Sequence, residues 1–224
     1  MKRWFITGTD TGIGKTEVSC ALLRHLAGLG FRAAGMKPVA SGCSRTPDGL
    51  RNEDALALLQ AANVELGYDR VNPYAFEPPI APHLAARAAG VEIDPERIAR
   101  IAAGIEADWL LVEGVGGWCV PLGQERMLAD LVRVLDCEVV LVVGLRLGCI
   151  NHALLSARQI IADGFALAGW VANAIDPAMQ VRNDNLQALA ERLPAPLLGV
   201  IPWRGDQAAT WRVDWTLDLQ GFRP

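Results

Sequence analysis

The sequence predicts an α/β fold, with a mostly parallel, doubly wound sheet and helices on both of its faces. Two observations lead to this prediction. Short apolar runs alternate with helical patterns along the whole 224-residue chain, as expected for parallel strands joined by crossover helices. Most of the runs are continuously apolar, which is typical of strands covered on both faces. Ligands of such folds bind at the carboxyl ends of the strands, so polar residues that follow each run are candidates for a site.

The predicted elements follow one another in regular order. The predicted strands are Trp4–Thr7, Ala33–Val39, Trp109–Glu113, Val139–Gly144, Ala168–Asn173 and Leu197–Ile201. The predicted helices are Lys15–Leu29, Asp54–Ala62, Ile80–Ala89, Pro95–Ala107, Met127–Leu135, Ile150–Asp163 and Val181–Leu193. The helix from Pro95 has the clearest start signal, because Asp94 is a good N-cap and proline is favoured at the first helical position.

No repeat, low-complexity tract or long linker divides the chain, so residues 1–224 are expected to form a single domain. The segments Ala40–Glu53 and Asn72–Pro82 are expected to be loops, and loops of this length are often functional. The tail from Gly205 has no strong pattern, and we expect Trp211 and Trp215 to anchor it.

The composition restricts the class of protein. With 51% hydrophobic and 21% charged residues, the chain resembles a globular enzyme and is not expected to be disordered. A net charge of -4 argues against nucleic acid as an electrostatic partner. No apolar run approaches the ~20 residues of a membrane span, so no membrane association and a cytoplasmic location are expected. The five cysteines are scattered without metal or redox spacing.

The segment from Ile6 to Thr16 predicts a phosphate-binding loop of the P-loop NTPase type. It reads Ile-Thr-Gly-Thr-Asp-Thr-Gly-Ile-Gly-Lys-Thr and lies between a predicted strand and a predicted helix. Its backbone N–H groups and the helix N-terminus can hold phosphate oxygens. Lys15 would bind the β- and γ-phosphates, and the Thr16 hydroxyl suits Mg²⁺. The spacing is a variant of the usual pattern, and the alternative is a glycine-rich turn without a ligand.

Two further clusters follow predicted strands. Lys37 and Ser41, in Met-Lys-Pro-Val-Ala-Ser-Gly, suit an anionic ligand, although the residues alone fit an ordinary lysine and turn equally well. Glu113 ends an apolar strand and precedes Gly-Val-Gly-Gly. A buried carboxylate needs a partner or a metal, so Glu113 is a candidate ligand of the Thr16 metal. The alternative is a solvated carboxylate at the strand end.

Three weaker candidates complete the set. Asp54 could reach a Mg²⁺ ion, although complementing a helix dipole is a slightly better explanation from the residues alone. The helix start Gly148–Asn151 could hold a carboxylate or be a plain capping turn. Asn173 and the Pro202 region end late strands, where P-loop folds reach the base of the nucleotide. The histidines His25, His83 and His152 are interpreted as structural.

With these clusters in place, the chain resembles the dethiobiotin synthetase family. The resemblance covers nearly the whole chain and rests on an ordered set of segments. These are GTDTGIGKT at 8–16, AGMKPVASG at 34–42, RNEDALAL at 51–58, VNPYAFEPPIAPH at 71–83, LVEGVGGW at 111–118, LVVGLRLGCINHALL at 141–155, GWVAN at 169–173 and PAPLLGVIPW at 194–203.

The resemblance implies an ATP- and Mg²⁺-dependent ligase that joins CO₂ to 7,8-diaminopelargonate. In the family reaction, one amine forms a carbamate, which attacks the γ-phosphate of ATP to give a carbamic–phosphoric anhydride. The second amine then closes the ureido ring of dethiobiotin, releasing phosphate beside ADP. ATP is therefore a co-substrate. The family is homodimeric, with a substrate site shared across the interface.

The resemblance also assigns roles to residues. Lys37 and Lys15 are the expected catalytic groups, and Thr16, Asp54 and Glu113 the expected Mg²⁺ ligands. The substrate would contact Ser41, Gly148, Cys149, Ile150 and Asn151, the last four as the helix start that takes the substrate carboxylate from the partner subunit. The nucleotide would contact Gly12, Ile13, Gly14, Lys15, Thr16, Glu17, Asp54, Glu113, Gly114, Val115, Gly116, Asn173, Pro202, Trp203 and Arg204.

Two positions depart from relatives of the family. Gly12 stands where some relatives have an acidic residue, and Ala174 stands where an acidic residue can follow the asparagine. Two competing classes share the fold. Amidotransferases of the cobyrinic-acid type carry an additional glutaminase domain. Nucleotide-switch ATPases usually have an extra lysine early in the loop, where this chain has Gly-Thr-Asp-Thr. Neither class accounts for the KPVASG and GCINH segments.

Overall fold

The computed structural model describes residues 1–203, 205, 214 and 215. Its chain forms two compact units. The first comprises Met1–Phe5, Ser19–Val115 and Cys119–Cys137, and the second Ile6–Val18, Gly116–Trp118 and Glu138–Pro224. The expectation of a single domain stays a prediction.

The largest sheet confirms the predicted fold class. Its strands follow the hydrogen-bonding order β11-β10-β9-β8-β1-β7-β2. They are β1 (Lys2–Gly8), β2 (Ala33–Met36), β7 (Trp109–Glu113), β8 (Glu138–Leu145), β9 (Leu167–Ala174), β10 (Leu197–Ile201) and β11 (Asp214–Trp215). The pairs β2–β7, β8–β9 and β9–β10 are parallel, and β10–β11 is antiparallel. Because two parallel strands cannot be joined by a tight hairpin, each parallel pair needs a crossover connection, which is usually a helix.

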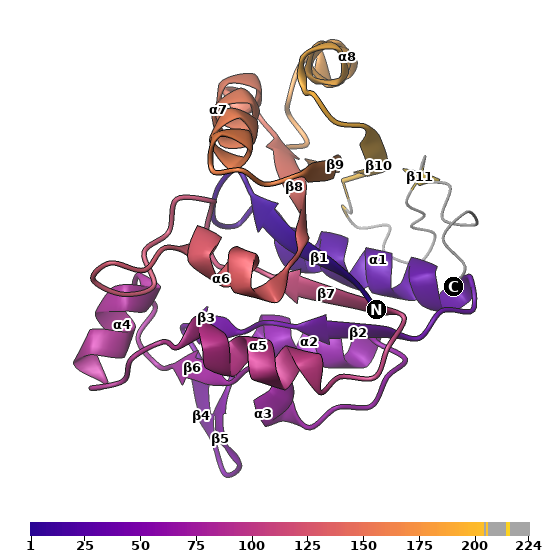
Figure 1. Cartoon of the computed structure of the whole chain (residues 1–224). Coiled ribbons are helices and arrows are strands. Elements are labelled where there is room, and N and C mark those ends of the chain that lie inside the picture. Colours follow the sequence, from indigo (N-terminus) through magenta and orange to yellow (C-terminus); the bar gives the residue numbers. More distant parts are fainter. Residues whose placement is uncertain (204, 206–213, 216–224) are drawn as a thin grey trace. The chain divides into compact units, whose positions relative to one another are not determined.

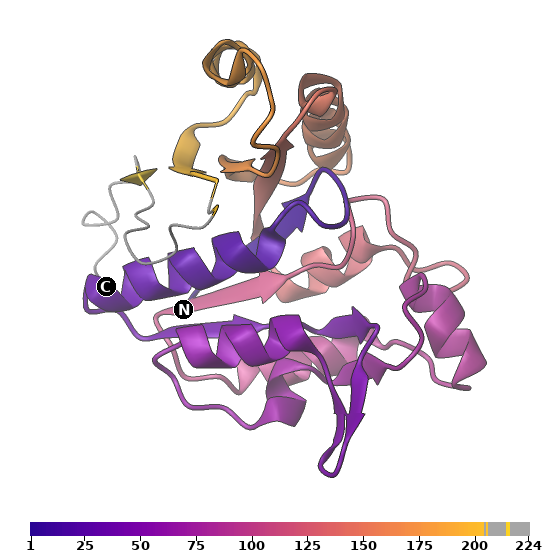
Figure 2. The same cartoon turned by 180° about the vertical axis from the view of Figure 1, so that it is seen from behind.

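In the first unit, helices cover both faces of the β2–β7 pair. The helix α2 (Glu53–Ala61) packs on one face, while α5 (Pro95–Ala103) and α6 (Leu128–Leu135) lie on the other (Figures 1 and 2). As predicted, Asp94 caps α5, since its Oδ1 accepts the Glu96 N–H at 2.9 Å and Pro95 takes the first helical position. The unit also contains α3 (Tyr68–Val71), α4 (Pro82–Ala88) and most of α1 (Lys15–Gly28).

The core of the first unit contains an aromatic cluster. Trp109, the first residue of β7, meets Trp4 edge-on with ring centroids 4.9 Å apart, and Phe31 at 6.3 Å. All three side chains are buried. Edge-to-face packing suits the quadrupoles of aromatic rings, so this cluster fixes the start of β7, the strand that ends at Glu113.

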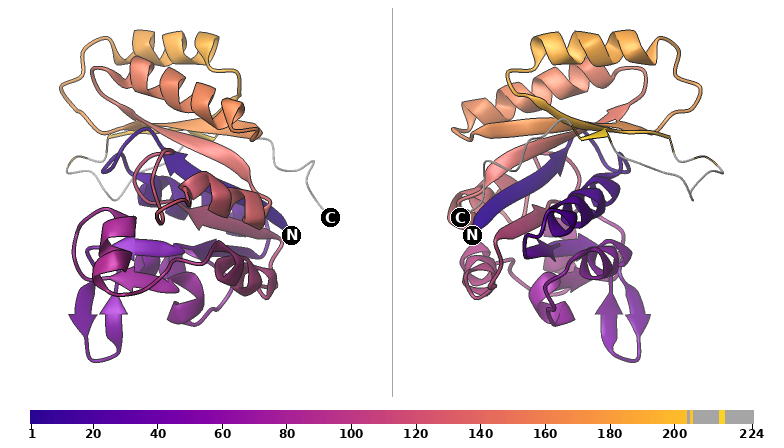
Figure 3. Two further views of the ribbon diagram at one scale, coloured as in Figure 1. Left: turned by 60° about the vertical axis from the view of Figure 1, so that its left-hand side comes forward. Right: turned by 90° about the vertical axis from the view of Figure 1, so that its right-hand side faces the viewer.

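In the second unit, two helices cover one face of the parallel strands. The helices α7 (Cys149–Ala162) and α8 (Arg182–Arg192) pack side by side, and α7 contacts both β8 and β9 (Figure 3). The buried run of β8 explains this packing, because every residue from Val139 to Leu145 is buried. No helix in the described part of either unit is long and apolar enough to span a membrane.

Several sequence predictions need correction. The expected strand Ala33–Val39 breaks after Met36, because Pro38 lacks the N–H that a sheet ladder needs. Val39–Ser41 forms a separate strand β3, which pairs with β6 (Tyr74–Phe76). The two expected loops therefore contain short strands, including the hairpin β4 (Ser44–Thr46) and β5 (Gly49–Arg51). Its Pro-Asp-Gly turn was a readable signal.

The remaining expectations concern the end of one helix and the C-terminal tail. The helix expected to reach Ala107 ends at Ala103, where the Gly104 N–H closes the last turn. Trp211 lies outside the described residues, and Trp215 belongs to β11, so the anchoring role of both stays a prediction.

Candidate functional site

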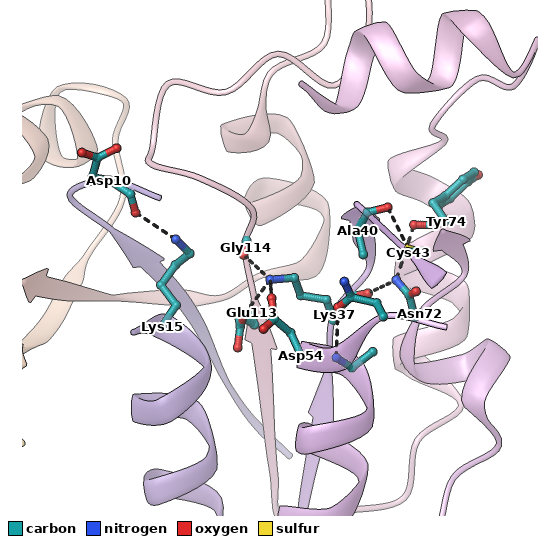
Figure 4. Close-up of polar contacts among 12 residues, drawn as sticks. Asp10, Lys15, Lys37, Ala40, Cys43, Asp54, Asn72, Tyr74, Glu113 and Gly114 are labelled. Carbon is teal, nitrogen blue, oxygen red and sulfur yellow. Dashed lines mark hydrogen bonds and ion pairs between the residues drawn. The ribbon is translucent and has the colours of Figure 1, made fainter. Parts of the chain in front are cut away.

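Three residues assigned to the site meet in the first unit. Lys37 directly follows β2, Glu113 ends β7, and Asp54 lies in the first turn of α2. The parallel register pairs Met36 with Val112, so the chain leaves both strands at the same edge and Lys37 and Glu113 come together. The sequence interpretation placed these residues at strand ends, and the structure adds that their charged groups touch (Figure 4).

The Lys37 ammonium is surrounded by three oxygen acceptors. Its Nζ donates to Glu113 Oε1 at 2.6 Å, to Asp54 Oδ2 at 2.9 Å and to the Gly114 carbonyl at 3.3 Å. The side chains of Lys37 and Glu113 are 5% and 1% exposed, whereas Asp54 is 42% exposed. Burial by itself lowers the pKa of Lys37, but attraction to Glu113 and Asp54 outweighs it, and the net pKa is raised. Lys37 is therefore a fixed positive charge at neutral pH.

The two carboxylates fit a Mg²⁺ ion chemically. Asp54 and Glu113 already converge on one cation, the Lys37 ammonium, and Mg²⁺ favours one or two carboxylates completed by phosphate and water. Among the described residues, no group of three or more histidine, cysteine, aspartate or glutamate side chains could hold a metal. A Mg²⁺ ion here would thus need further oxygen ligands. Thr16, the third expected ligand, belongs to the second unit, and its metal role stays a prediction.

Ser41 offers a hydroxyl for a ligand. It ends β3, and its Oγ is buried without a hydrogen-bond partner among the described residues. A buried hydroxyl without a partner costs free energy, so a polar ligand group would be well placed there. Gly114 and Val115 follow Glu113 in the same unit, where the Gly114 carbonyl already accepts from Lys37.

The phosphate-binding loop lies in the second unit and has the expected form. Gly12 and Gly14 have φ values of 71° and 83°, a left-handed conformation in which glycine is favoured. The buried Lys15 opens α1 and donates from Nζ to the Asp10 carbonyl at 3.0 Å (Figure 4). The side chain of Lys15 thus folds back over the loop.

Asp10 and Arg146 form a contact that the sequence analysis missed. The Asp10 carboxylate accepts the Thr11 N–H at 2.7 Å and Arg146 Nη2 at 2.5 Å. The Thr11 N–H lowers the pKa of Asp10; partial burial raises it, Arg146 lowers it again, and the net shift is downward. Arg146 lies two residues before Gly148, the first residue of the Gly148–Asn151 helix start, so the pair ties the phosphate-binding loop to the β8–α7 loop. The residues are 136 positions apart, and no local signal could have found them.

Asn173 donates hydrogen bonds to the phosphate-binding loop and to the start of α1. Its side chain is buried, and its Nδ2 donates to the Ile13 carbonyl at 2.9 Å and to Glu17 Oε2 at 3.3 Å. The sequence interpretation assigned Asn173 to the adenine edge. Because the amide N–H group is used within the protein, a base contact would rely on the carbonyl oxygen, and that contact stays a prediction.

The start of α7 is the candidate for a turn that binds an anion or is a plain capping turn. Gly148 is the N-cap, with a φ of 92° and no side-chain cap. Cys149 is buried and Ile150 half-buried, while Asn151 is exposed. In the same unit, Gly116 has a φ of 65°, and Pro202 and Trp203 are exposed after β10. Arg204 lies outside the described residues, and the ligand contacts of all these positions stay predictions.

Comparisons with known proteins decide the family. The profile of a family described as an AAA domain matches residues 2–210. The ATP-dependent dethiobiotin synthetase BioD of Pseudomonas paraeruginosa is 57% identical over 209 residues, which are 92% of each chain. The chain belongs to the dethiobiotin synthetase family. The BioD protein of Xanthomonas oryzae pv. oryzae is 53% identical over 208 residues, 92% of this chain and 93% of that protein.

Solved structures confirm the P-loop NTPase type of fold. The chloroplast FtsY of Physcomitrella patens superposes with a TM-score of 0.59 at 19% identity, covering 99% of this chain and 63% of FtsY. The MinD cell division protein of Aquifex aeolicus gives a TM-score of 0.57 at 19% identity, covering 92% of this chain and 84% of MinD. At such identities the likeness concerns the fold alone.

Proposed function

We propose that this chain is an ATP-dependent ligase that makes dethiobiotin from 7,8-diaminopelargonate and CO₂, releasing ADP and phosphate. Membership of the dethiobiotin synthetase family supports this function. The observation that carries it is the buried Lys37 ammonium, held by Glu113 and Asp54 beside the carboxyl ends of β2 and β7. A fixed cation is what a reaction among carbamate, γ-phosphate and released phosphate requires.

The proposed chemistry needs no protein nucleophile. One amine of the substrate adds to the carbon of CO₂ and loses a proton, giving a carbamate. A carbamate oxygen attacks the γ-phosphorus of ATP and expels ADP, which gives a carbamic–phosphoric anhydride. The second amine attacks the carbonyl carbon, phosphate leaves, and the ureido ring closes. Lys37 offsets the negative charge that builds on the carbamate and phosphoryl oxygens.

The remaining assigned residues bind and orient. The loop from Gly12 to Thr16, with Lys15, would hold the phosphates of ATP, and Ser41 would contact the substrate. Mg²⁺ would be held by Asp54, Glu113 and Thr16, and when bound it neutralises charge on the phosphate oxygens. We also propose that this activity takes place in the cytoplasm.

The activity assay tests this function. Purified protein with MgATP and bicarbonate should release ADP only when 7,8-diaminopelargonate is added, with one dethiobiotin formed per ADP. ADP release would be measured by a coupled assay and dethiobiotin by mass spectrometry. ATP turnover that ignores the diamine and yields no dethiobiotin would contradict the proposal and leave only the fold established.

We also propose a homodimer in which the Gly148–Asn151 helix start of one subunit receives the substrate carboxylate at the site of the other. The N-cap without a side-chain cap supports an anion at this position. Sedimentation velocity at assay concentration should give a species of twice the 24.1 kDa chain mass. A monomer with full activity at the same concentration would exclude the shared site.

A further inference from the structure

A series of hydrogen bonds connects the backbone of Lys37 with the start of the helix that carries Asp54. Asn72 donates from Nδ2 to the Lys37 carbonyl at 2.7 Å, and its Oδ1 accepts from the Tyr68 hydroxyl at 3.0 Å. The same hydroxyl accepts the backbone N–H of Asn52 at 2.7 Å. Asn52 is the N-cap of α2, two residues before Asp54. The series therefore runs from the backbone of Lys37 to the first turn of the helix that carries Asp54.

Every member of this series of hydrogen bonds is held in place. Asn72 and Asn52 are 3% and 8% exposed, and the Asn52 side chain is used in capping, since Oδ1 accepts the Ala55 N–H at 3.2 Å. The Arg51 guanidinium stacks 4.2 Å over the Tyr68 ring, a favourable cation–π arrangement. Burial raises the pKa of the Tyr68 hydroxyl, so it keeps its proton and can donate to Asn72 at neutral pH.

This series of hydrogen bonds is relevant to catalysis because it begins at the backbone of Lys37 and ends at the helix that carries Asp54. Lys37 leaves β2 just before Pro38, so the sheet ladder does not extend beyond it, and its backbone depends on other partners. Its N–H donates to the Val71 carbonyl at 2.9 Å, and its carbonyl accepts from Asn72 (Figure 4). Residues of α3 and of the turn after it thus determine where the Lys37 backbone lies. The 2.9 Å contact between Lys37 Nζ and Asp54 Oδ2 requires both backbones to keep their separation.

We propose that Tyr68 and Asn72 are positioning residues that set the Lys37 ammonium relative to Asp54. Neither residue was singled out by the sequence analysis, and neither is assigned a contact with the substrate or the nucleotide. The inference rests on the proposed function, because it assigns to Lys37 the role of stabilising the carbamate and phosphoryl oxygens. A small displacement of a group fixed before reaction lowers the rate steeply. Removing a hydrogen bond of Tyr68 or Asn72 should therefore lower turnover.

The first variant is Tyr68→Phe, which keeps the ring and its contact with Arg51 but removes the hydroxyl. Tyr74→Phe is the matched control, because the Tyr74 hydroxyl also accepts the N–H of a helix N-cap, Asp94, at 3.1 Å. That helix, α5, carries no residue assigned to the reaction. We expect Tyr68→Phe to lower kcat on the order of tenfold, while Tyr74→Phe stays within about twofold, with similar falls in Tm for the two variants. A kcat of Tyr68→Phe equal to that of the control would overturn the inference.

A double-mutant cycle separates positioning of Lys37 from a general structural effect. In a Lys37→Ala background, Tyr68→Phe should cause little further loss of kcat, because the group that it positions is already gone. An equal loss in both backgrounds would show that Tyr68 does not act through Lys37. If Tyr68→Phe does not fold, Asn72→Ser, measured against the same control, takes its place with the same expected result.

Measurements on the wild-type protein separate the proposed function from the proposed positioning role of Tyr68 and Asn72. Diamine-dependent ADP release by the wild type tests the function, and the ratio of variant to wild type tests the positioning role. A wild type that turns over ATP without the diamine would remove the function, while the same ratios measured on that ATP turnover would still report on Tyr68.

Discussion

Replacing Lys37 by alanine should lower turnover by about 10²-fold or more, the loss seen when a fixed charge-stabilising donor is removed. The ammonium lies between Glu113 and Asp54, with its positive charge fixed before reaction, so alanine at position 37 removes a charge that both carboxylates hold in place. The measurement is kcat for ADP release with saturating MgATP, bicarbonate and 7,8-diaminopelargonate. Turnover near the wild-type value would remove Lys37 from the mechanism.

The loss of activity must be separated from a loss of stability. Removing one partner of a buried ion pair costs about 3–5 kcal/mol, and the Lys37–Glu113 pair is buried on both sides. Chemical denaturation should therefore show that Lys37→Ala is destabilised, and kcat should be compared at a temperature where both proteins are folded. Lys2→Ala is the matched control, because Lys2 is exposed and lies over the Trp109 ring at 5.5 Å. Lys2→Ala should keep wild-type turnover.

The pH dependence of the stability difference has a definite sign. The folded-state pKa of Lys37 is raised above the ordinary value of 10.5. The stability that its charge contributes is therefore fully present below the unfolded-state pKa and is lost as the pH rises through the raised folded value. The difference in unfolding free energy between wild type and Lys37→Ala should be constant near neutrality and shrink only in strongly alkaline solution.

Sequence reasoning reached the site because the relevant signals are local. Glu113 ends an apolar run, and Lys37 lies near the end of another run that is followed by a small polar loop, so both could be placed at the carboxyl edge of the sheet from the sequence. The Gly-Lys-Thr segment likewise predicted a loop between a strand and a helix, and in the structure Gly12 and Gly14 of this loop have left-handed conformations. These predictions depend only on strand direction and on the backbone needs of single residues.

The interactions that hold the site together could not be predicted in this way. The ion pair of Lys37 with Glu113 spans 76 positions, and that of Asp10 with Arg146 spans 136. The run through Val39 was read as one strand, although Pro38 sends it to a second sheet. The roles of Tyr68 and Asn72 depend on α3, a one-turn helix of four residues, which is too short for a periodic pattern. Tertiary contacts decide each of these cases.

The second large effect is expected at Gly14. An added Cβ at this position would lie 2.0 Å from Asn173 Nδ2 and 3.0 Å from Glu17 Oε2, so Gly14→Ala must displace Asn173. That side chain is buried, and its Nδ2 donates to the Ile13 carbonyl at 2.9 Å. Moving it breaks this hydrogen bond, which holds the phosphate-binding loop. We expect the Kd for MgATP, measured by calorimetry, to rise by about 10²-fold. The reason is that the loop no longer holds its backbone N–H groups in the geometry that binds phosphate, and restoring that geometry costs binding free energy.

Gly12→Ala is the matched control for this prediction. Gly12 has a similar positive φ of 71°, but a Cβ there would meet nothing within 4 Å. Both variants carry the strain of a left-handed alanine, of about 1–2 kcal/mol, so the difference between them isolates the collision with Asn173. Gly12→Ala should therefore raise the Kd by less than Gly14→Ala does. Equal Kd values would contradict this account. The double variant Gly14→Ala/Asn173→Ala should recover part of the affinity, because the colliding amide is then absent and only the lost hydrogen bond to Ile13 remains.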